Sequence, residues 1–489
     1  MALQGTPGFV GVIMFLIVFG VMIIVPLTTT GTHNNVNHTG TPPPGNELAV
    51  PLGASLLGID DLYTQRICNS SSVLPGRATN ERLLSNQVFV QSASVPDPRN
   101  LNALTWSFGQ FIDHDTILSV EDAGLVGDSI EMVPNTGTFL DVERVQRRYN
   151  EPLNSISAHI DGGTIYGDYK DPSKLAQLRQ SIGGVLQCKL REGPGRTPYL
   201  KDGHFFCGDE RCSENMMLTS IHALFLREHN WRCDQLPRDW TEEQRMWKAR
   251  ALTVATIQHI AYSEWLPTLY GSQSSMLNTV PHKGTYTRIS TEFGTAAYRF
   301  GHSMIAETLG ELVLRDLFFN PNLTISIGVD GILSRGIQQH AERVDNKVVE
   351  SLRNFLFTTD HFTVSEDLVT RNLYRAREVG MASYEQLCTC FGTPPTGTLN
   401  PGTPTDPLLG LLSEPLMSGS SLPRTLALII AEQFSRLRDN DENFYLHPYT
   451  SPLSRAERYA ITKTNMRTII LRNTDLAPGD VPHNAFKLY

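Results

Sequence analysis

The sequence predicts a mainly α-helical protein, built as a single large helical domain with very little β-structure. Three segments carry large apolar residues at the three- and four-residue intervals that put them on one face of a helix. These sets are Leu104, Phe108, Phe111 and Ile112, then Leu218, Ile221, Leu224 and Phe225, and then Leu426, Ile429, Ile430 and Phe434. Alternation of apolar and polar residues, which indicates a half-buried strand, is short and sparse.

The composition is that of a globular protein with a large core. Of the 489 residues 40% are hydrophobic and 19% are charged, and the formal net charge is -9. This acidic balance, without a dominant basic stripe, argues against a nucleic-acid partner. From about residue 51 onward the composition is uniform and no internal repeat is visible. We therefore expect one domain over residues 51–489.

The N-terminal segment indicates export. Residues 8–25 form an unbroken run of glycine and apolar residues, and no Lys, Arg, Asp or Glu precedes Glu47. A run of this length is typical of a signal peptide or a membrane anchor over residues 1–30, with the anchor slightly favoured. Residues 31–50, rich in Thr, Asn and Pro, read as a flexible linker. N-x-S/T sequons at Asn37, Asn69 and Asn322 agree with a secreted or membrane-anchored, extracytoplasmic domain.

The cysteine count also agrees with an oxidising compartment. The chain has seven cysteines, so at least one has no partner within the chain. Their spacing matches no zinc-binding pattern. We expect two or three disulfides, with buried free thiols as the alternative reading.

The segment Gly109–Asp115 is the first with chemical potential. On a helix, Gln110 and His114 lie on one face, one turn apart. Asp113 and Asp115 flank the histidine, so it is a candidate general base. Taken alone, however, the segment is better interpreted as the polar end of a surface helix.

A second candidate segment begins at Arg211 and leads into an apolar helix. Arg211 and Glu214 are three residues apart, which by itself indicates no more than an intrahelical ion pair. We interpret His222 and His229, seven residues apart on the same helix, as core or packing histidines rather than ligands.

A third histidine, His302, lies in the segment Tyr298–Ser303. Gly301 beside it permits the close approach of a flat cofactor. A histidine that binds iron needs its second ring nitrogen held by a partner. Asn372, in a later basic segment, offers an amide oxygen for that purpose.

Taken together, these segments resemble the animal haem peroxidases of the peroxidase–cyclooxygenase superfamily. The resemblance rests on five motifs that follow one another in the family's order and covers roughly residues 50–480. The motifs are FGQFIDHD at 108–115, GDERCSENMMLTSIHALFLREHN at 208–230, AAYRFGHS at 296–303, DLVTRNLYRAREVG at 367–380 and EQFSRLRDNDENFY at 432–445.

The resemblance implies a role for each of the central residues. His302 is then the proximal ligand of the iron of haem b, and Asn372 orients its ring. His114 is the distal acid–base, and Arg211 stabilises the charge that develops as the O–O bond of peroxide breaks. Gln110 holds distal water and borders the halide site.

The same resemblance places four further residues around the haem. Asp113 and Glu214 match the two carboxylates that form ester bonds with haem methyl groups in this family. Arg299 and Arg375 match the arginines that pair with the haem propionates. Asn215 stands where a Met would be needed for a third, sulfonium link, so that link is not expected here.

The resemblance also implies a structural Ca²⁺. Asp115 is then one ligand, and the others come from a loop that supplies the Ser157 oxygen, the His159 carbonyl and the Asp161 carboxylate. Hard oxygen donors of this kind suit calcium. The family's last ligand is usually a serine hydroxyl, whereas this chain has Gly163, and we therefore expect weaker binding.

The expected activity is reduction of hydrogen peroxide and oxidation of halide, phenolic or tyrosyl donors through a ferryl intermediate. A first alternative is a haem-dependent fatty-acid dioxygenase, which needs a tyrosine three residues before the proximal histidine. Here Arg299 occupies that position and Tyr298 precedes it, rotated by about 100° around a helix. A second alternative is a non-enzymatic adhesion protein on a peroxidase scaffold, but all the chemical positions are intact. No motif encodes the donor or the oligomeric state.

Overall fold

This computed structural model describes residues 64–68, 80–122, 128–133, 138–142, 144–148, 151–168, 171–284, 287–356, 366–397 and 405–489. The predicted signal or anchor at 1–30, the linker at 31–50 and the sequons Asn37 and Asn69 lie outside these residues. Within them, no helix is both long and apolar enough to cross a membrane. Asn322 lies on a short helix and is exposed.

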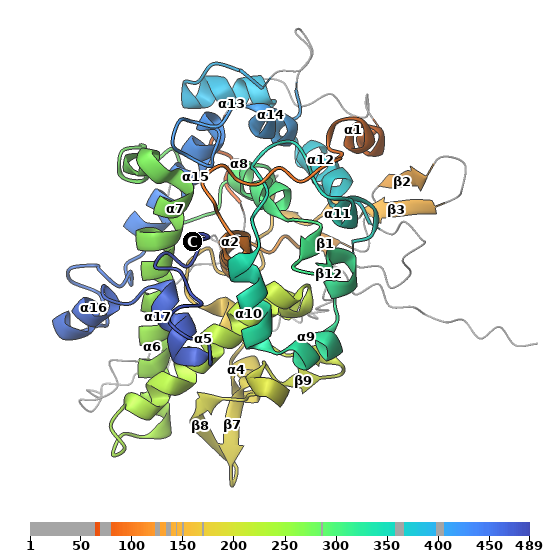
Figure 1. Ribbon diagram of the computed structural model, residues 1–489. Helices are drawn as coiled ribbons and strands as arrows, with labels where there is room; N and C mark the ends of the chain where they lie inside the picture. The colour runs from red at the N-terminus through yellow and green to blue at the C-terminus, as the bar shows by residue number, and fades with distance from the viewer. Residues whose placement is uncertain are drawn as a thin grey trace, which may run out of the picture. The chain divides into compact units, whose positions relative to one another are not determined.

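Helices dominate the described residues, as predicted (Figure 1). The α-helices are α1 Glu81–Val88, α2 Ala103–Thr116, α3 Gly163–Tyr166, α4 Pro172–Leu178, α5 Met216–Gln235, α6 Glu242–Ile260, α7 Leu266–Tyr270, α8 Thr291–Thr295, α9 Pro321–Ile327, α10 Val329–Gln338, α11 Glu350–Asn354, α12 Leu368–Glu378, α13 Tyr384–Phe391, α14 Pro407–Ser413, α15 Arg424–Asp439, α16 Arg455–Ile461 and α17 Met466–Asn473. Tighter or wider turns are η2 Pro194–Arg196, η3 Glu210–Ser213, η4 Ala261–Trp265, η5 Gly271–Asn278, η6 Ala297–Met304 and η7 Leu314–Leu317.

The β-structure consists of antiparallel pairs, and every sheet among the described residues has two strands. The strands are β1 Glu121–Asp122, β2 Asp128–Val133, β3 Thr138–Val142, β4 Arg144–Val145, β5 Arg147–Arg148, β6 Glu151–Pro152, β7 Arg179–Ile182, β8 Val185–Leu190, β9 Leu200–Lys201, β10 His204–Phe205, β11 Thr308–Leu309 and β12 Leu312–Val313. The pairs are β1–β4, β2–β3, β5–β6, β7–β8, β9–β10 and β11–β12. The mainly α prediction is therefore confirmed.

The core is built around α5. Almost every side chain of this helix is buried, and it contacts α2, α6, α10 and α17. Its N-terminus is capped by Asn215, whose Oδ1 accepts a hydrogen bond from the Leu218 amide at 2.9 Å. The three apolar sets predicted from sequence spacing lie on α2, α5 and α15 and are buried, so each amphipathic pattern marks a core-facing helix.

Three disulfides are present in the described chain, and Cys388 is left as a buried free thiol. The pairs are Cys68–Cys390, Cys188–Cys233 and Cys207–Cys212. This confirms the expectation of two or three disulfides with an unpaired cysteine. The longest link closes a loop of 322 residues, and a cross-link of this span removes much conformational entropy from the unfolded chain.

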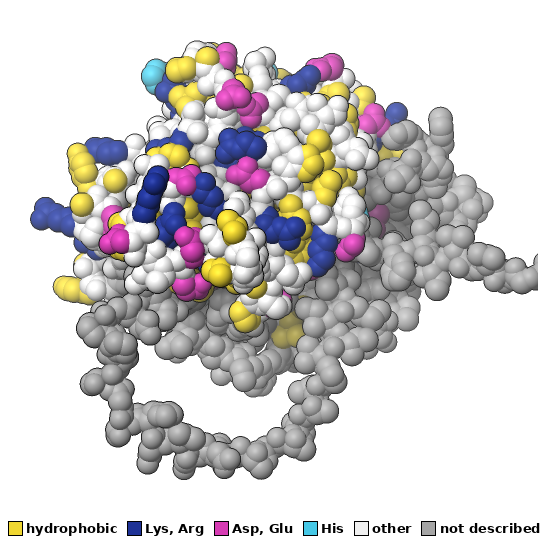
Figure 2. Space-filling model, turned by 90° about the horizontal axis from the view of Figure 1, so that it is seen from below, with side chains coloured by type: hydrophobic (Ala, Val, Ile, Leu, Met, Phe, Trp, Pro, Cys, Tyr) yellow, Lys and Arg dark blue, Asp and Glu magenta, His cyan; other side chains and the backbone are white. Residues whose placement is uncertain are grey.

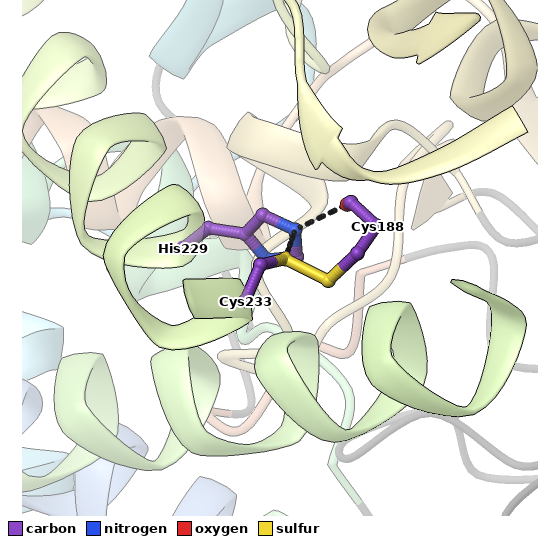
Figure 3. Close-up of side chains that lie close together, drawn as sticks. All are labelled: Cys188, His229 and Cys233. Atoms are coloured by element: carbon purple, nitrogen blue, oxygen red, sulfur yellow. Dashed lines mark hydrogen bonds between the residues drawn. A yellow bond between two sulfur atoms is a disulfide. The ribbon is translucent and has the colours of Figure 1, made fainter. Parts of the chain in front are cut away.

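The second disulfide lies against His229, as Figure 3 shows. The ring Nε2 of His229 is 3.0 Å from the Cys188 carbonyl oxygen and 3.4 Å from Cys233 Sγ, and Nδ1 is 3.0 Å from the Tyr166 hydroxyl. Both ring nitrogens therefore have partners, and His229 is the core histidine that the sequence predicted. The sulfur atoms are bonded to each other and are not free to act as thiolate ligands for a metal.

Charged side chains of both signs are interspersed on the face shown in Figure 2. Dark blue lysines and arginines alternate there with magenta acids and with uncharged surface. Among the atoms described, this face presents no continuous basic surface of the kind that binds a phosphate backbone.

Candidate active site

Helix α2 carries four of the predicted site residues on a rigid, buried frame. Asn102 caps its first turn by accepting a hydrogen bond from the Leu104 amide at 3.1 Å. A Cβ atom at Gly109 would lie 3.0 Å from the ring of Trp265, so the glycine lets α2 approach that ring closely. Gln110 and His114 follow on one face of the helix, as predicted.

His114 is buried, and its imidazole is held in the neutral form. Burial, assisted by the nearby Arg211, holds the pKa of its imidazole well below the ordinary value. Its Nδ1 lies 3.7 Å from Asp209 Oδ1 and its Nε2 lies 3.8 Å from Glu214 Oε2. Both distances are longer than a hydrogen bond, so the neutral ring is free to accept a proton.

Arg211 is held by Asp209, a residue that the sequence analysis did not single out. Arg211 Nε donates to Asp209 Oδ1 at 2.9 Å and Nη2 donates to Asp209 Oδ2 at 2.8 Å. Nη2 also donates to the carbonyl oxygens of His114 and Ile117. Arg211 therefore forms a bidentate pair with Asp209 and not the intrahelical ion pair with Glu214 that the spacing alone allows. Within the described part of the chain, Nη1 makes no hydrogen bond and remains available.

Asp209 is 7% exposed, yet it stays ionised. Burial alone would raise the pKa of its carboxyl group, but the charge of Arg211 and the hydrogen bonds from Arg211 outweigh burial and hold the pKa far below the ordinary value. The same carboxylate accepts a hydrogen bond from the Arg211 amide and begins the turn η3. An Asp at the start of a turn was the only local signal for it.

Two buried carboxyl groups, those of Asp113 and Glu214, each have one oxygen without a hydrogen-bond partner. Gln110 Nε2 donates to Glu214 Oε2 at 2.8 Å, and Asn215 Nδ2 donates to Gln110 Oε1 at 3.0 Å. Burial raises the pKa of Glu214 to about 8 and also raises the pKa of Asp113. Arg299 Nη1 lies 3.5 Å from Asp113 Oδ2. An unpaired buried polar atom is costly, so these oxygens point to a missing partner.

His302 lies on η6 and is held by Asn372 from α12. The Asn372 Nδ2 atom lies 2.9 Å from His302 Nδ1, and the oxygen and nitrogen of a side-chain amide exchange places by a flip of the group. With the amide oxygen turned toward the ring, Nδ1–H donates to it and Nε2 keeps a free lone pair. Burial lowers the pKa of His302 to about 3. The ring is therefore neutral and oriented, as an iron ligand must be.

The two histidine segments belong to one site. Turn η6 contacts α2, and the Tyr298 hydroxyl donates to the Gly109 carbonyl oxygen at 3.2 Å. Arg299 of η6 forms an ion pair with Asp113 of α2, which is a second contact between these two elements. Arg375 pairs with Glu378 one turn further along α12, at 3.2 Å. The fit to haem rests on the neutral His302 and on the orphaned oxygens of Asp113 and Glu214.

The predicted calcium ligands also come together. Asp115 and Asp161 are buried, and burial together with the neighbouring Asp161 raises the pKa of Asp115 to about 7. A Cβ atom at Gly163 would lie 3.3 Å from Asp161 Oδ1 and 3.5 Å from Asp115 Oδ1. Ser157 Oγ accepts a hydrogen bond from the His159 amide at 3.1 Å, and this bond closes a turn in the loop that leads to Asp161. Two desolvated carboxylates that face one position suit a hard cation.

Thr164 is a further residue of this group that the sequence analysis did not name. Its amide and its hydroxyl both bond to Asp115 Oδ1, at 2.9 and 3.2 Å. The Thr164 carbonyl oxygen accepts a hydrogen bond from the Asp209 amide at 3.0 Å. A Cβ atom at Gly208 would lie 2.2 Å from the Gly163 oxygen, so only glycine permits this contact. The acidic loop and the Arg211 turn are thus directly joined.

His222 is a packing residue, as predicted. Its ring lies edge-on against Phe111, with centroids 5.1 Å apart. Burial lowers the pKa of this imidazole to about 4. The neutral ring of His222 therefore packs against α2, the helix that carries His114, and adds no charge beside His114.

A mainly helical domain that combines a neutral buried histidine, a fixed arginine and a second, amide-held histidine defines a haem-binding oxidoreductase. The model of the animal haem peroxidase family matches residues 28–405 and 403–486. The chain therefore belongs to the animal haem peroxidase family and is a haem peroxidase.

Known relatives agree with this assignment. Peroxinectin A of Dictyostelium discoideum is 28% identical over 476 residues, covering 83% of this chain and 87% of that protein. The human peroxidasin homolog is 25% identical and covers 92% of this chain, which spans 36% of that protein. Peroxidase A of Dictyostelium discoideum matches with a TM-score of 0.70 at 25% identity, covering 87% of this chain and 96% of that one.

One group of similar structures has a different chemistry. The fatty acid α-dioxygenase of Oryza sativa superposes with a TM-score of 0.70 at 17% identity, covering 88% of this chain and 84% of that one. At this identity the likeness shows the shared fold alone.

Proposed function

We propose that this chain reduces hydrogen peroxide at His114 and Arg211 and uses the oxidising equivalents to oxidise halide, phenolic or tyrosyl donors. The observation that carries this proposal is the pairing of a neutral imidazole with an arginine whose Nη1 has no partner. A base and a cation beside each other are the two groups that O–O bond cleavage needs.

His302 would hold haem b through Nε2, and the bound haem would supply the two electrons that reduce peroxide. His114 Nε2 takes the proton from one peroxide oxygen and returns it to the other, which then leaves as water. Arg211 Nη1 donates to the departing oxygen while negative charge develops on it. Asp209 keeps the guanidinium in place, so no reorganisation is needed during the reaction.

Asp113 and Glu214 are proposed to contact the haem edge and to form the ester bonds implied by the resemblance. In support, both carboxyl groups are buried, and both keep one oxygen free of hydrogen bonds. Their raised pKa values favour the neutral acid, and an ester bond would remove the cost of burying a charge there.

The domain is proposed to act on the extracytoplasmic side of a membrane. The three disulfides support an oxidising compartment. The exposed sequon at Asn322 is accessible to glycosylation.

The deciding experiment is the optical spectrum of the haem-loaded protein before and after one equivalent of hydrogen peroxide. We expect a Soret band that shifts with peroxide and returns when iodide or a phenol is added. A Soret band that ignores peroxide, or a folded protein that binds no haem when haem is supplied, would overturn the proposal.

The fatty-acid dioxygenase alternative is tested by oxygen uptake with a polyunsaturated fatty acid. Tyr298 lies four residues before His302, and its hydroxyl is bonded to the Gly109 carbonyl. We expect no oxygen uptake, because this hydroxyl is engaged with α2 rather than presented to a substrate.

Replacing Asp209 with asparagine is expected to slow the reaction with peroxide by roughly 10²-fold, the effect of a small displacement of a catalytic group. Asparagine keeps the size of the side chain but loses the negative charge of the carboxylate, whose two oxygens bind Nε and Nη2 of Arg211. Stopped-flow changes in the Soret band would measure the rate. In an Arg211→Ala background the same change should have little further effect, because residues that act as a unit are not additive. Additive losses would show that Asp209 acts independently of Arg211.

Removal of calcium is expected to lower the midpoint of thermal unfolding. We propose Ca²⁺ between Asp115 and Asp161, because the two buried carboxylates otherwise repel each other. A ligand present at a hundred times its Kd stabilises the folded state by about 2.7 kcal/mol. Circular dichroism with and without a chelator measures the shift, and added Ca²⁺ should reverse it. An Asp161→Asn variant should show a smaller shift; an unchanged midpoint in the wild type would contradict the site.

A further inference from the structure

A continuous series of aromatic side chains runs from the proximal segment η6 toward the surface beside α6. The successive ring centroids are 5.8 Å apart for Tyr298–Phe434, 6.0 Å for Phe434–Tyr262, 5.4 Å for Tyr262–Phe444 and 4.9 Å for Phe444–Tyr445. Phe444 and Tyr445 belong to the segment 432–445, which resembles the family. No residue of this segment belongs to the candidate active site.

The middle of this series depends on an unusual backbone. Residues Ala261–Trp265 form the π-helical turn η4 between α6 and α7. Pro267 has no N–H to donate to the carbonyl four residues earlier, which favours the wider turn. Tyr262 lies in this turn and donates its hydroxyl to the Phe434 carbonyl at 2.9 Å. The turn η4 thus packs Tyr262 against α15, where it lies between the buried Phe434 and the surface.

The series ends on a hydrogen-bonded tyrosine and histidine. The Tyr445 hydroxyl lies 2.7 Å from His259 Nδ1, and Ser263 Oγ lies 3.1 Å from the same nitrogen. Tyr445 is 1% exposed, whereas His259 and Tyr262 are half-buried and Ser263 is exposed. Burial raises the pKa of Tyr445 to about 12 and lowers the pKa of His259. The phenol therefore keeps its proton in the resting protein, and His259 Nδ1 lies at hydrogen-bond distance to receive that proton when the phenol is oxidised.

We propose that Tyr445 and His259 form a second oxidation site at the surface, which oxidises phenolic groups too bulky for the haem cavity, such as tyrosine side chains of other proteins. This inference rests on the proposed peroxidase function, which supplies the oxidant. Tyrosine carries a phenol, which is readily oxidised by one electron. Electrons pass rapidly between aromatic rings in contact. The partly exposed His259 and Tyr262 let a bulky donor approach without entering the protein.

The proposed step balances in electrons and protons. One electron leaves the Tyr445 ring through Tyr262 and Tyr298 to the peroxide-oxidised enzyme, and the phenol proton moves to His259 Nδ1. The resulting neutral tyrosyl radical takes one electron from the donor phenol and recovers its proton from His259. The donor becomes a phenoxyl radical and releases its own proton to water. Two donors are oxidised for each hydrogen peroxide reduced to two molecules of water.

The test uses the haem-loaded full chain, one equivalent of hydrogen peroxide and a nitroso spin trap. Peptide mass spectrometry then locates the adduct, and freeze-quench electron paramagnetic resonance records the tyrosyl signal. We expect an adduct on Tyr445 that is lost in Tyr445→Phe. This variant keeps the aromatic ring and its packing and removes only the hydroxyl. The matched control is Tyr459→Phe, since Tyr459 is 66% exposed and lies outside the series.

The same variants separate the surface site from the haem cavity. Oxidation of tyrosines on a folded protein donor should be lost in Tyr445→Phe and kept in Tyr459→Phe, while iodide oxidation is unchanged in both. Adducts confined to other tyrosines, or unchanged oxidation of the protein donor by Tyr445→Phe, would overturn the inference. A wild-type Soret band that does not respond to peroxide would instead overturn the proposed function, and this inference with it.

Discussion

Replacing His302 with alanine is expected to leave the protein without bound haem. Its imidazole is the neutral, amide-oriented group proposed to bind the iron, and Asn372 lies 2.9 Å from its Nδ1. No other side chain of η6 offers a nitrogen lone pair at this position, because the remaining polar groups are a hydroxyl, a phenol and a guanidinium. The ratio of Soret absorbance to protein absorbance, measured after gel filtration, reports the loss.

A general loss of stability would also release haem, so a second buried histidine serves as the control. His222 is buried on α5, packs against Phe111 and is not one of the proposed haem ligands. His222→Ala should keep its haem, whereas His302→Ala should regain haem only when free imidazole is added. Full haem occupancy in His302→Ala without imidazole would show that another residue is the ligand.

Replacing His114 with alanine is expected to leave haem in place and to slow the reaction with peroxide by about 10²- to 10⁴-fold, the usual contribution of a positioned acid–base group. The expectation follows from a neutral imidazole beside Arg211, with no hydrogen bond on Nδ1. Stopped-flow mixing with peroxide, followed at the Soret band, gives the rate constant directly.

The companion variant Arg211→Lys tests the other half of the pair. Lysine keeps the positive charge but lacks the planar fork that Asp209 holds at two atoms. We expect it to keep haem and to lose part of the rate. A His114→Ala protein that reacts as fast as the wild type would show that the acid–base group lies elsewhere, whatever the result for Arg211.

The candidate site residues could be proposed from the sequence because the motifs that resemble the family are short and continuous, although no motif taken alone indicates a site. Gln110 and His114 share one face of a single helix, and the apolar residues that orient this helix lie within the same turns. The His302 segment was likewise found from adjacent residues. Asp209 was missed because an Asp two residues before an Arg is common in turns, and its value comes from a second contact with His114.

The helical class, the core-facing helices and the short motifs of the candidate site follow from the sequence, since each depends on neighbours within a few residues. The unpaired cysteine follows from the odd number of cysteines. Which groups meet depends on the tertiary structure. It pairs Cys68 with Cys390 across 322 residues, and it joins the acidic loop to the Arg211 turn through Gly208. It also places Tyr445 on His259. Such contacts depend on how helices pack, and packing is set by the whole core rather than by any local pattern.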